Sequence, residues 1–197
     1  MPFDAAFGEF PVLQTERLVL REVVPSDAEA LYAIFSDPEA MEYYDTTVFT
    51  TLAEAEDLIE HMRSRRASRE KVRWGITLRG EDTVIGTVGY VWMVERHNWS
   101  EVGYDLVRTH WRQGIMAEAL AAVVTFGFEK MGMHRVEALV DAQGGREDFE
   151  RPCKIEDLDF IEQENTYNSG HAVLSNTQSV DSMGTASHFR VGTINLR

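Results

Sequence analysis

The change in hydrophobic period along the chain most constrains its fold. Apolar residues first alternate, then recur at helical spacing, then alternate through a long middle stretch before one more helix and a last alternating run. In chain order these segments are a strand over 13–24, helices over 26–35 and 51–62, strands over 72–80, 83–95 and 100–107, a helix over 115–130 and a strand over 134–142. Two helices before a meander of strands predict an α+β domain on a mostly antiparallel sheet.

Local signals mark where the first helices begin. Pro25 ends the opening strand, in which Leu18 and Leu20 share one face. The pair Ser26 and Glu29 has the spacing of a capping box, in which a hydroxyl and a carboxylate satisfy the free amides of a helix start. Thr51 and Glu54 repeat that spacing, and the basic run 63–71 closes the second helix where cations suit the helix dipole.

Charge and composition exclude several classes of protein. The formal net charge is -14 with 19 basic residues, so the surface repels nucleic acid and anionic lipid at long range. Such a surface serves solubility, which we favour, or attracts cationic partners such as amines. The chain has no apolar run of membrane-spanning length and no signal peptide at its start. A single cysteine, Cys153, forms no internal disulfide. These features predict a cytoplasmic protein with no nucleic-acid or membrane partner.

The sequence offers no metal site and no covalent nucleophile. No nucleophile-elbow motif occurs, and Cys153 has no identified partner. The histidines are scattered without metal-ligand spacing; they are His61, His97, His110, His134, His171 and His188. The chemistry of this chain therefore has to come from another motif.

That motif is WRQGIMAEAL, at 111–120, where a glycine stands just before an amphipathic helix. A helix start leaves backbone N–H groups unpaired and carries the positive end of the dipole. Glycine lets an anion approach the backbone closely, and Arg112 adds a charge. The stretch is therefore either a phosphate site or a simple turn in which Gly114 links a strand to a helix.

The longer run EVGYDLVRTHWRQGIMAEAL, at 101–120, resembles the acetyl-CoA site of the GNAT acetyltransferases. It is most similar to the branch of ribosomal-protein-alanine acetyltransferases, the RimJ/RimL type. TERLVLREVVPSDAEALYAIFSDPEAM, WGITLRGEDTVIGTVGY and RVEALV extend the resemblance over about residues 13–142. The resemblance implies the GNAT fold and acetyl-CoA as co-substrate.

The resemblance also implies which residues hold acetyl-CoA. The backbone of Leu106 and Val107 would pair with the pantetheine arm as a strand does. Backbone amides of the loop and first helical turn would hold the pyrophosphate; these residues are Arg112, Gln113, Gly114, Ile115, Met116 and Ala117.

In this family the amine attacks the thioester directly. Glu101 is the candidate base; the alternative is that it is a solvent-facing strand carboxylate and that a water chain takes the proton instead. Tyr43, Tyr44 and Trp92 are candidates for an acceptor pocket, or else aromatic edges of the core. Tyr104 is interpreted as strand packing. A homodimer is compatible with this assignment.

The ending departs from the family. After VDAQ the family has an asparagine, a helix and two further strands, but here Gly144 and Pro152 stand in that region. The sequence 155–162 fits a short helix or strand, and from Gln163 on polar residues dominate. We therefore divide the chain into an extension over 1–12, a GNAT domain over 13–142 that is incomplete at its end, and an atypical tail over 143–197. A replaced C-terminus is favoured over a lineage-specific ending. It would leave the strand at 134–142 as an unpaired edge.

The sequence thus predicts an acetyl-CoA-dependent N-acetyltransferase. Its acceptor is a primary amine, either on a protein N-terminus or on a small molecule. The alternative is a non-catalytic protein that binds acetyl-CoA or a partner and has lost turnover with the C-terminal motif. A third alternative is a defective product without a stable fold.

Overall fold

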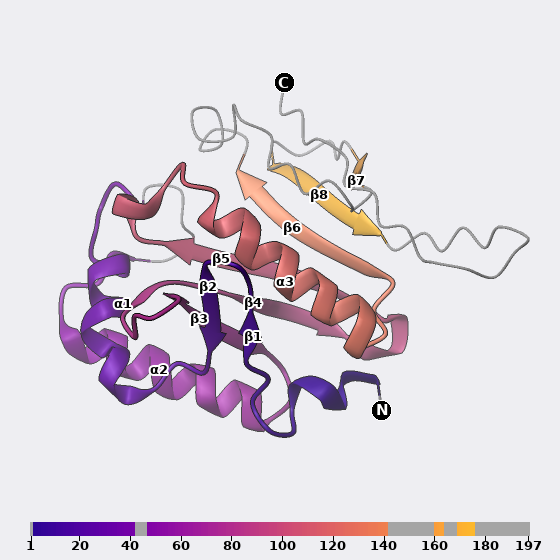
Figure 1. Cartoon of the computed structure of the whole chain (residues 1–197), viewed down its shortest axis with the longest axis horizontal. Coiled ribbons are helices and arrows are strands. Elements are labelled where there is room, and N and C mark those ends of the chain that lie inside the picture. The colour runs from indigo at the N-terminus through magenta and orange to yellow at the C-terminus, as the bar shows by residue number, and fades with distance from the viewer. Residues whose placement is uncertain (1, 42–46, 142–159, 164–168, 176–197) are drawn as a thin grey trace, which may run out of the picture.

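The structure, a computed structural model, describes residues 2–41, 47–141, 160–163 and 169–175. Its helices are α1 (Ala28–Phe35), α2 (Leu52–Ala67) and α3 (Ile115–Lys130), with short 3-10 helices η1 (Pro2–Ala6), η2 (Pro25–Asp27), η3 (Glu95–His97) and η4 (Arg108–His110). Its strands are β1 (Leu13–Gln14), β2 (Leu18–Arg21), β3 (Val72–Leu78), β4 (Val84–Val94), β5 (Trp99–Leu106), β6 (Arg135–Asp141), β7 (Phe160–Gln163) and β8 (Ser169–Ser175). The described strands form one sheet in the order β1-β2-β3-β4-β5-β6-β8-β7 (Figure 1).

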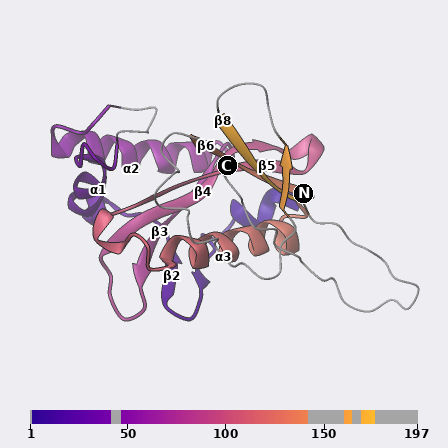
Figure 2. The ribbon, with the colours of Figure 1, turned by 90° about the horizontal axis from the view of Figure 1, so that it is seen from above.

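The sheet lies between two helical layers. Figure 2 shows α3 on one face and α1 and α2 on the other. The α3 face holds the larger buried cluster, which includes the fully buried Trp74 and Tyr90. Phe3 and Ala6, from η1, belong to this cluster too. The predicted α+β architecture is confirmed, and β5 and β6 are the parallel pair in an otherwise antiparallel sheet.

The close approach of α3 to β4 sets the position of that helix. The Tyr90 hydroxyl, on β4, donates a hydrogen bond of 2.5 Å to the Val123 carbonyl of α3. Gly127 allows this contact, because a Cβ there would lie 2.3 Å from the Tyr90 oxygen. A glycine inside a helix is thus a packing requirement here, despite its low helix propensity.

The single strand expected over 13–24 is wrong. The chain folds back on itself, so that β1 and β2 form a small antiparallel ladder with Leu13 opposite Leu20. The Thr15 hydroxyl accepts a hydrogen bond of 2.9 Å from the Leu18 amide and so stabilises the turn. Alternation of apolar residues continued across this turn, so the period alone did not reveal it.

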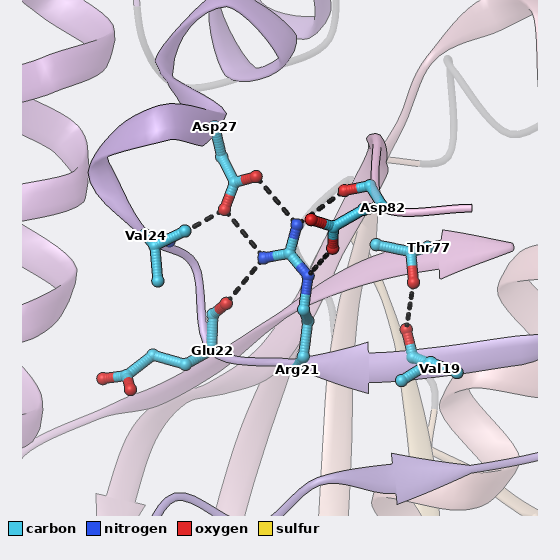
Figure 3. Close-up of polar contacts among 7 residues, drawn as sticks. All are labelled: Val19, Arg21, Glu22, Val24, Asp27, Thr77 and Asp82. Atoms are coloured by element: carbon cyan, nitrogen blue, oxygen red, sulfur yellow. Dashed lines mark hydrogen bonds and ion pairs between the residues drawn. The ribbon is translucent and has the colours of Figure 1, made fainter. Parts of the chain in front are cut away.

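The start of α1 also differs from the expected Ser26–Glu29 capping box. The carboxylate of Asp27 accepts the Val24 amide at 2.8 Å and so caps the turn at η2 (Figure 3). Both Asp27 oxygens also bind the Arg21 guanidinium, each at 2.8 Å. Arg21 reaches Asp82 as well, which lies between β3 and β4. Asp27 therefore caps this turn through its contact with Val24, in place of the expected box, and the ion pair with Arg21 holds its carboxylate in position.

The start of α2 matches its prediction. Glu54 accepts hydrogen bonds of 2.8 Å from the amides of Thr50 and Thr51. These bonds, from Thr50 first, lower the pKa of Glu54. At the other end of α2, Arg66 donates to the Gly8 carbonyl at 2.7 Å and lies over the Phe10 ring. The basic end of α2 therefore binds the N-terminal segment.

The expectation that the strand at 134–142 is an unpaired edge is wrong. That strand is β6, and it pairs with β8 from Arg135 opposite Ser175 to Asp141 opposite Ser169. β7 pairs with β8 in turn. The sequence between β6 and β7, which includes Gly144 and Pro152, lies outside the described residues. β8 thus covers the edge of β6, and β7, which lies largely within the segment 155–162 that fits a short helix or strand, pairs with β8.

We predict that Gly127→Ala destabilises the fold by about 1–3 kcal/mol, since the new methyl group overpacks the contact with Tyr90. Helix propensity alone predicts the opposite sign, a gain of about 1 kcal/mol. The midpoint of urea unfolding measures the change.

Tyr90→Phe supplies the control, because it removes the oxygen that the methyl group would meet. Gly127→Ala should cost less in that background than in the wild type. An equal cost in both backgrounds would show that the close approach does not determine this position.

Candidate active site

The parallel strands β5 and β6 pair over only part of their length. Their register runs from Trp99 opposite Arg135 to Val102 opposite Ala138. β5 then continues to Leu106 beside β4, while β6 continues beside β8. The register of β4 shifts at Val91, between Tyr90 and Trp92, and such a bulge increases local twist. The second half of β5 therefore has a backbone edge that β6 does not pair.

Alternation along β5 decides which residues present their backbone groups at that edge. The Val107 amide donates to the Ile85 carbonyl at 2.8 Å, so it points toward the β4 side. In an antiparallel ladder the backbone N–H and C=O groups of successive residues point to opposite edges of the strand. Because the Val107 amide points toward β4, the backbone groups of Leu106 and Tyr104 point toward the open edge. The Leu106 carbonyl accordingly accepts the Trp111 indole N–H at 2.7 Å. Of the two residues named from the sequence, Leu106 faces this edge and Val107 does not.

The loop after β5 brings the chain to the start of α3. Arg112 and Gly114 both have left-handed backbones, with φ of 60° and 71°. Left-handed residues occur in backbone turns that gather N–H groups toward an anion. The side-chain amide of Gln113 donates to the Thr109 carbonyl at 2.9 Å, which holds the turn in shape. The loop at 112–114 is exposed, so a ligand can reach it.

The first turn of α3 follows directly. Gly114 is the N-cap residue, and the amides of Ile115, Met116 and Ala117 have no carbonyl one turn earlier to bind. They lie at the positive end of the helix dipole. The six residues named from the sequence thus form one continuous, accessible helix start, which fits a phosphate group.

A contact between distant segments holds this helix start in place. Glu118, in the first turn of α3, accepts the Arg17 amide at 2.8 Å and the Arg17 Nε at 2.6 Å. The Thr15 hydroxyl donates to the same carboxylate at 2.5 Å. Arg17 also donates from Nη1 to the Gln113 carbonyl at 2.9 Å. The sequence analysis missed this clamp, because its two halves lie about a hundred residues apart and neither half shows a local signal.

The clamp changes the acidity of Glu118. Partial burial alone raises the pKa of that carboxyl, but the hydrogen bonds from Thr15 and Arg17 outweigh it and lower the pKa below its ordinary value of 4.5. Glu118 is therefore ionised at neutral pH and paired with the Arg17 guanidinium.

Glu101 lies where β5 still pairs on both sides. Its partner on β4 is Trp92, and its partner on β6 is Glu137. Trp92 is 62% exposed, so the aromatic edge is available to a ligand rather than packed in the core. Glu137, which the sequence analysis did not name, forms an ion pair with Arg135. Tyr43 and Tyr44 lie outside the described residues.

Among the residues that the structure describes, no group of three or more His, Cys, Asp and Glu side chains is arranged to hold a metal ion. The described helices include none with the length and apolar character that a membrane crossing requires.

The described part of the chain thus combines an open edge on one strand of a parallel pair with an exposed helix start. Residues 17–144 match the model of the acetyltransferase (GNAT) domain. The chain therefore belongs to the GNAT acetyltransferases, as the sequence resemblance predicted. This family uses acetyl-CoA.

Individual relatives agree with this assignment. The chain is 35% identical over 131 residues to the uncharacterised N-acetyltransferase YoaA of Bacillus subtilis, a match that covers 66% of this chain and 74% of YoaA. RimL, the ribosomal L7/L12 alpha-N-protein acetyltransferase, in complex with coenzyme A has a TM-score of 0.63 at 17% identity, covering 83% of this chain and 97% of RimL. An acetyltransferase from Agrobacterium tumefaciens has a TM-score of 0.60 at 21% identity, covering 85% and 95%.

We predict that Glu118→Gln destabilises the protein at neutral pH and that the deficit shrinks in acid. A carboxyl whose folded pKa is lowered contributes stability above its unfolded pKa, and this contribution is lost as the pH falls through the folded value. The difference between the two proteins in free energy of unfolding should have its full size near pH 7 and should decline below about pH 4.5. Urea unfolding at a series of pH values measures it.

Glu129→Gln, at the exposed end of α3, controls for removal of one negative charge from the same helix. A stability deficit of Glu118→Gln that stays constant into strong acid would contradict the ionic clamp.

Proposed function

We propose that this chain transfers the acetyl group of acetyl-CoA to a primary amine by direct attack within a ternary complex. The observation that carries the proposal is the edge of β5 beyond Val102, which leads from Glu101 to the exposed start of α3. An extended thioester arm paired along this edge would have its phosphates at the helix start and its acetyl group beside Glu101.

In this proposal the amides of the loop and first turn, Arg112 to Ala117, bind the pyrophosphate. Leu106 binds the pantetheine arm through its backbone, together with Tyr104, which faces the same edge. Val107 contributes through the turn that it forms: its carbonyl accepts the His110 amide at 3.0 Å. The clamp of Thr15, Arg17 and Glu118 keeps the helix start aligned with that edge.

Glu101 is the proposed general base. The acceptor ammonium gives up a proton, and its nitrogen then bonds to the thioester carbon. The carbon–sulfur bond breaks and coenzyme A leaves as a thiolate, and the second proton, which the nitrogen loses as the amide forms, passes directly or through solvent to that thiolate. Glu101 removes the first proton directly or through one water. Its neighbour Glu137 forms an ion pair with Arg135, so we assign the proton transfer to Glu101.

The acceptor is the least constrained part of the proposal. Trp92 lies opposite Glu101 and exposes its ring, so it suits the edge of an acceptor pocket; Tyr43 and Tyr44 are proposed to complete it. The acceptor is either a protein N-terminus or a small-molecule amine. The net charge of -14 favours cationic amines over nucleic acid. A cytoplasmic location and a homodimer remain part of the proposal.

We predict that acetyl-CoA stabilises the wild type and does not stabilise Gly114→Val. Ligand at about 100 times its dissociation constant should add about 2.7 kcal/mol to the folded state. Valine cannot adopt the left-handed backbone of Gly114 without strain, so the helix start would no longer close on the pyrophosphate. Thermal unfolding with and without acetyl-CoA measures both shifts.

Gly80→Val is the matched control, because Gly80 also has a positive φ, 89°, and lies in an open turn after β3. Both variants should unfold at lower temperature, but only Gly80→Val should keep the shift with acetyl-CoA. An unchanged shift in Gly114→Val would remove this loop from the cofactor site.

We predict that Glu101→Gln lowers kcat by about a hundredfold or more while the dissociation constant of acetyl-CoA stays near that of the wild type. Release of coenzyme A thiol in the presence of an amine panel measures turnover. Glu137→Gln removes the neighbouring carboxylate and should keep most of its rate. A wild type that binds acetyl-CoA but acetylates no amine would instead favour the non-catalytic alternative.

A further inference from the structure

The contact between Arg17 and the loop before α3 fixes the orientation of one peptide group. The Arg17 guanidinium donates from Nη1 to the Gln113 carbonyl at 2.9 Å. A trans peptide is planar, and its C=O and N–H point to opposite sides. The described part of the chain contains no cis peptide bond. The Gly114 N–H belongs to the same peptide as the Gln113 carbonyl and therefore points away from Arg17.

The Gly114 N–H has no partner of its own within the described part of the chain. No backbone carbonyl there accepts it, and no side chain caps the helix at this position. Gly114 is exposed, so a ligand can reach this donor. The first amides of α3 are also unpaired, as at any helix start. By fixing the Gln113 carbonyl, Arg17 thus adds the Gly114 N–H to the set of donors at the helix start.

Glycine allows this peptide to turn over. Reversal of the peptide between Gln113 and Gly114 changes ψ of Gln113 and φ of Gly114, and glycine accepts φ of either sign at little cost. The observed φ of Gly114 is 71°. In the reversed orientation the Gln113 carbonyl would face the ligand, so a repelling oxygen would replace a donor. The bond from Arg17 therefore favours the orientation that binds an anion.

Arg17 is itself held in a fixed position. Its Nε donates to the Glu118 carboxylate at 2.6 Å, and its backbone amide donates to the same carboxylate at 2.8 Å. Its Nη2 lies 3.4 Å from the position that a Cβ would take on Gly114. The planar guanidinium thus binds a carboxylate on one side and a peptide carbonyl on the other. A lysine ammonium, which is a single point charge, does not reproduce this fork.

Charge alone does not account for an arginine at this position. Glu118 balances the charge of Arg17, so the pair brings little net charge to a nearby phosphate. Arg17 also lies on the carbonyl side of the peptide, opposite the Gly114 N–H. Its effect on a bound anion therefore acts through the peptide that it orients.

We propose that Arg17 is a positioning residue for the pyrophosphate of acetyl-CoA: its bond to the Gln113 carbonyl directs the Gly114 N–H toward the phosphate. This inference rests on the proposed function. It assigns Arg17 no contact with acetyl-CoA and no part in the transfer of the acetyl group. The effect of Arg17 on binding is confined to ligands that carry the pyrophosphate.

The test measures the dissociation constants of acetyl-CoA, acetyl-dephospho-CoA and S-acetylpantetheine by titration. The first ligand carries the pyrophosphate and the ribose phosphate, the second carries the pyrophosphate alone, and the third carries neither. Arg17→Lys keeps the charge beside Glu118 but has no second arm for the Gln113 carbonyl. We expect this variant to bind acetyl-CoA and acetyl-dephospho-CoA about tenfold or more weakly, as loss of a hydrogen bond to a charged group predicts, and to bind S-acetylpantetheine as the wild type does.

Arg79→Lys is the matched control. Arg79 is an exposed arginine whose guanidinium donates to the Thr15 carbonyl, so it binds the same turn between β1 and β2. Within the described residues it forms no hydrogen bond to the loop at 112–114. Arg79→Lys should therefore leave all three dissociation constants near those of the wild type.

The amide proton of Gly114 gives a direct measurement by NMR in isotope-labelled wild-type protein. Acetyl-CoA should move this signal downfield, because the N–H gains a charged acceptor. S-acetylpantetheine should leave it in place. This measurement needs no variant, so it tests the inference independently of how well Arg17→Lys folds.

An equal loss of affinity for all three ligands in Arg17→Lys would overturn this inference, by showing a purely structural role. Unchanged affinity of Arg17→Lys for acetyl-CoA would also overturn it, and so would a Gly114 signal that does not respond when acetyl-CoA binds the wild type. Both results would leave the transferase function standing. A wild type that binds none of the three ligands would overturn the proposed function itself, and this inference with it.

Discussion

The contact of α3 with β4 is the constraint on which the site depends. Tyr90 bonds to the Val123 carbonyl, and Gly127 leaves room for the ring that makes this bond. The helix is thereby held close along the sheet, which brings its first turn beside the end of β5. Without that approach the amides near Gly114 and the open edge near Leu106 would be separate features rather than one extended surface.

Two further contacts complete the arrangement. The clamp between Arg17 and Glu118 ties the β1–β2 ladder to the first turn of α3, and the ion pair of Arg21 with Asp27 ties β2 to the start of α1. On the opposite face the network of Arg73, Thr87 and Asp105 joins the three strands beside the proposed base. These charged side chains position elements, whereas the proposed acetyl-CoA surface is largely backbone.

Local sequence patterns predicted the structure correctly where that structure depends on contacts within one segment. Thr51 and Glu54 cap α2 as their spacing predicts, and Gly114 adopts the left-handed turn that a strand-to-helix junction needs. They failed where a neighbouring contact replaced the expected one. Asp27 caps the turn at η2 while bound to Arg21, and β1 and β2 form two strands although the alternation is continuous. The edge of β6 is covered by β8, whose sequence shows little strand pattern, because ladder pairing uses the backbone.

By itself the sequence determined the family, the order of the elements from α1 to β6 and the position of the loop proposed to bind the cofactor, because hydrophobic period and a glycine before a helix are local properties. Only the tertiary structure decided which backbone groups of β5 face the open edge and which residues hold the loop. Those answers depend on strand register and on contacts between residues far apart in the chain, such as Thr15 with Glu118. Register is set by packing of the whole sheet, and no single segment encodes it.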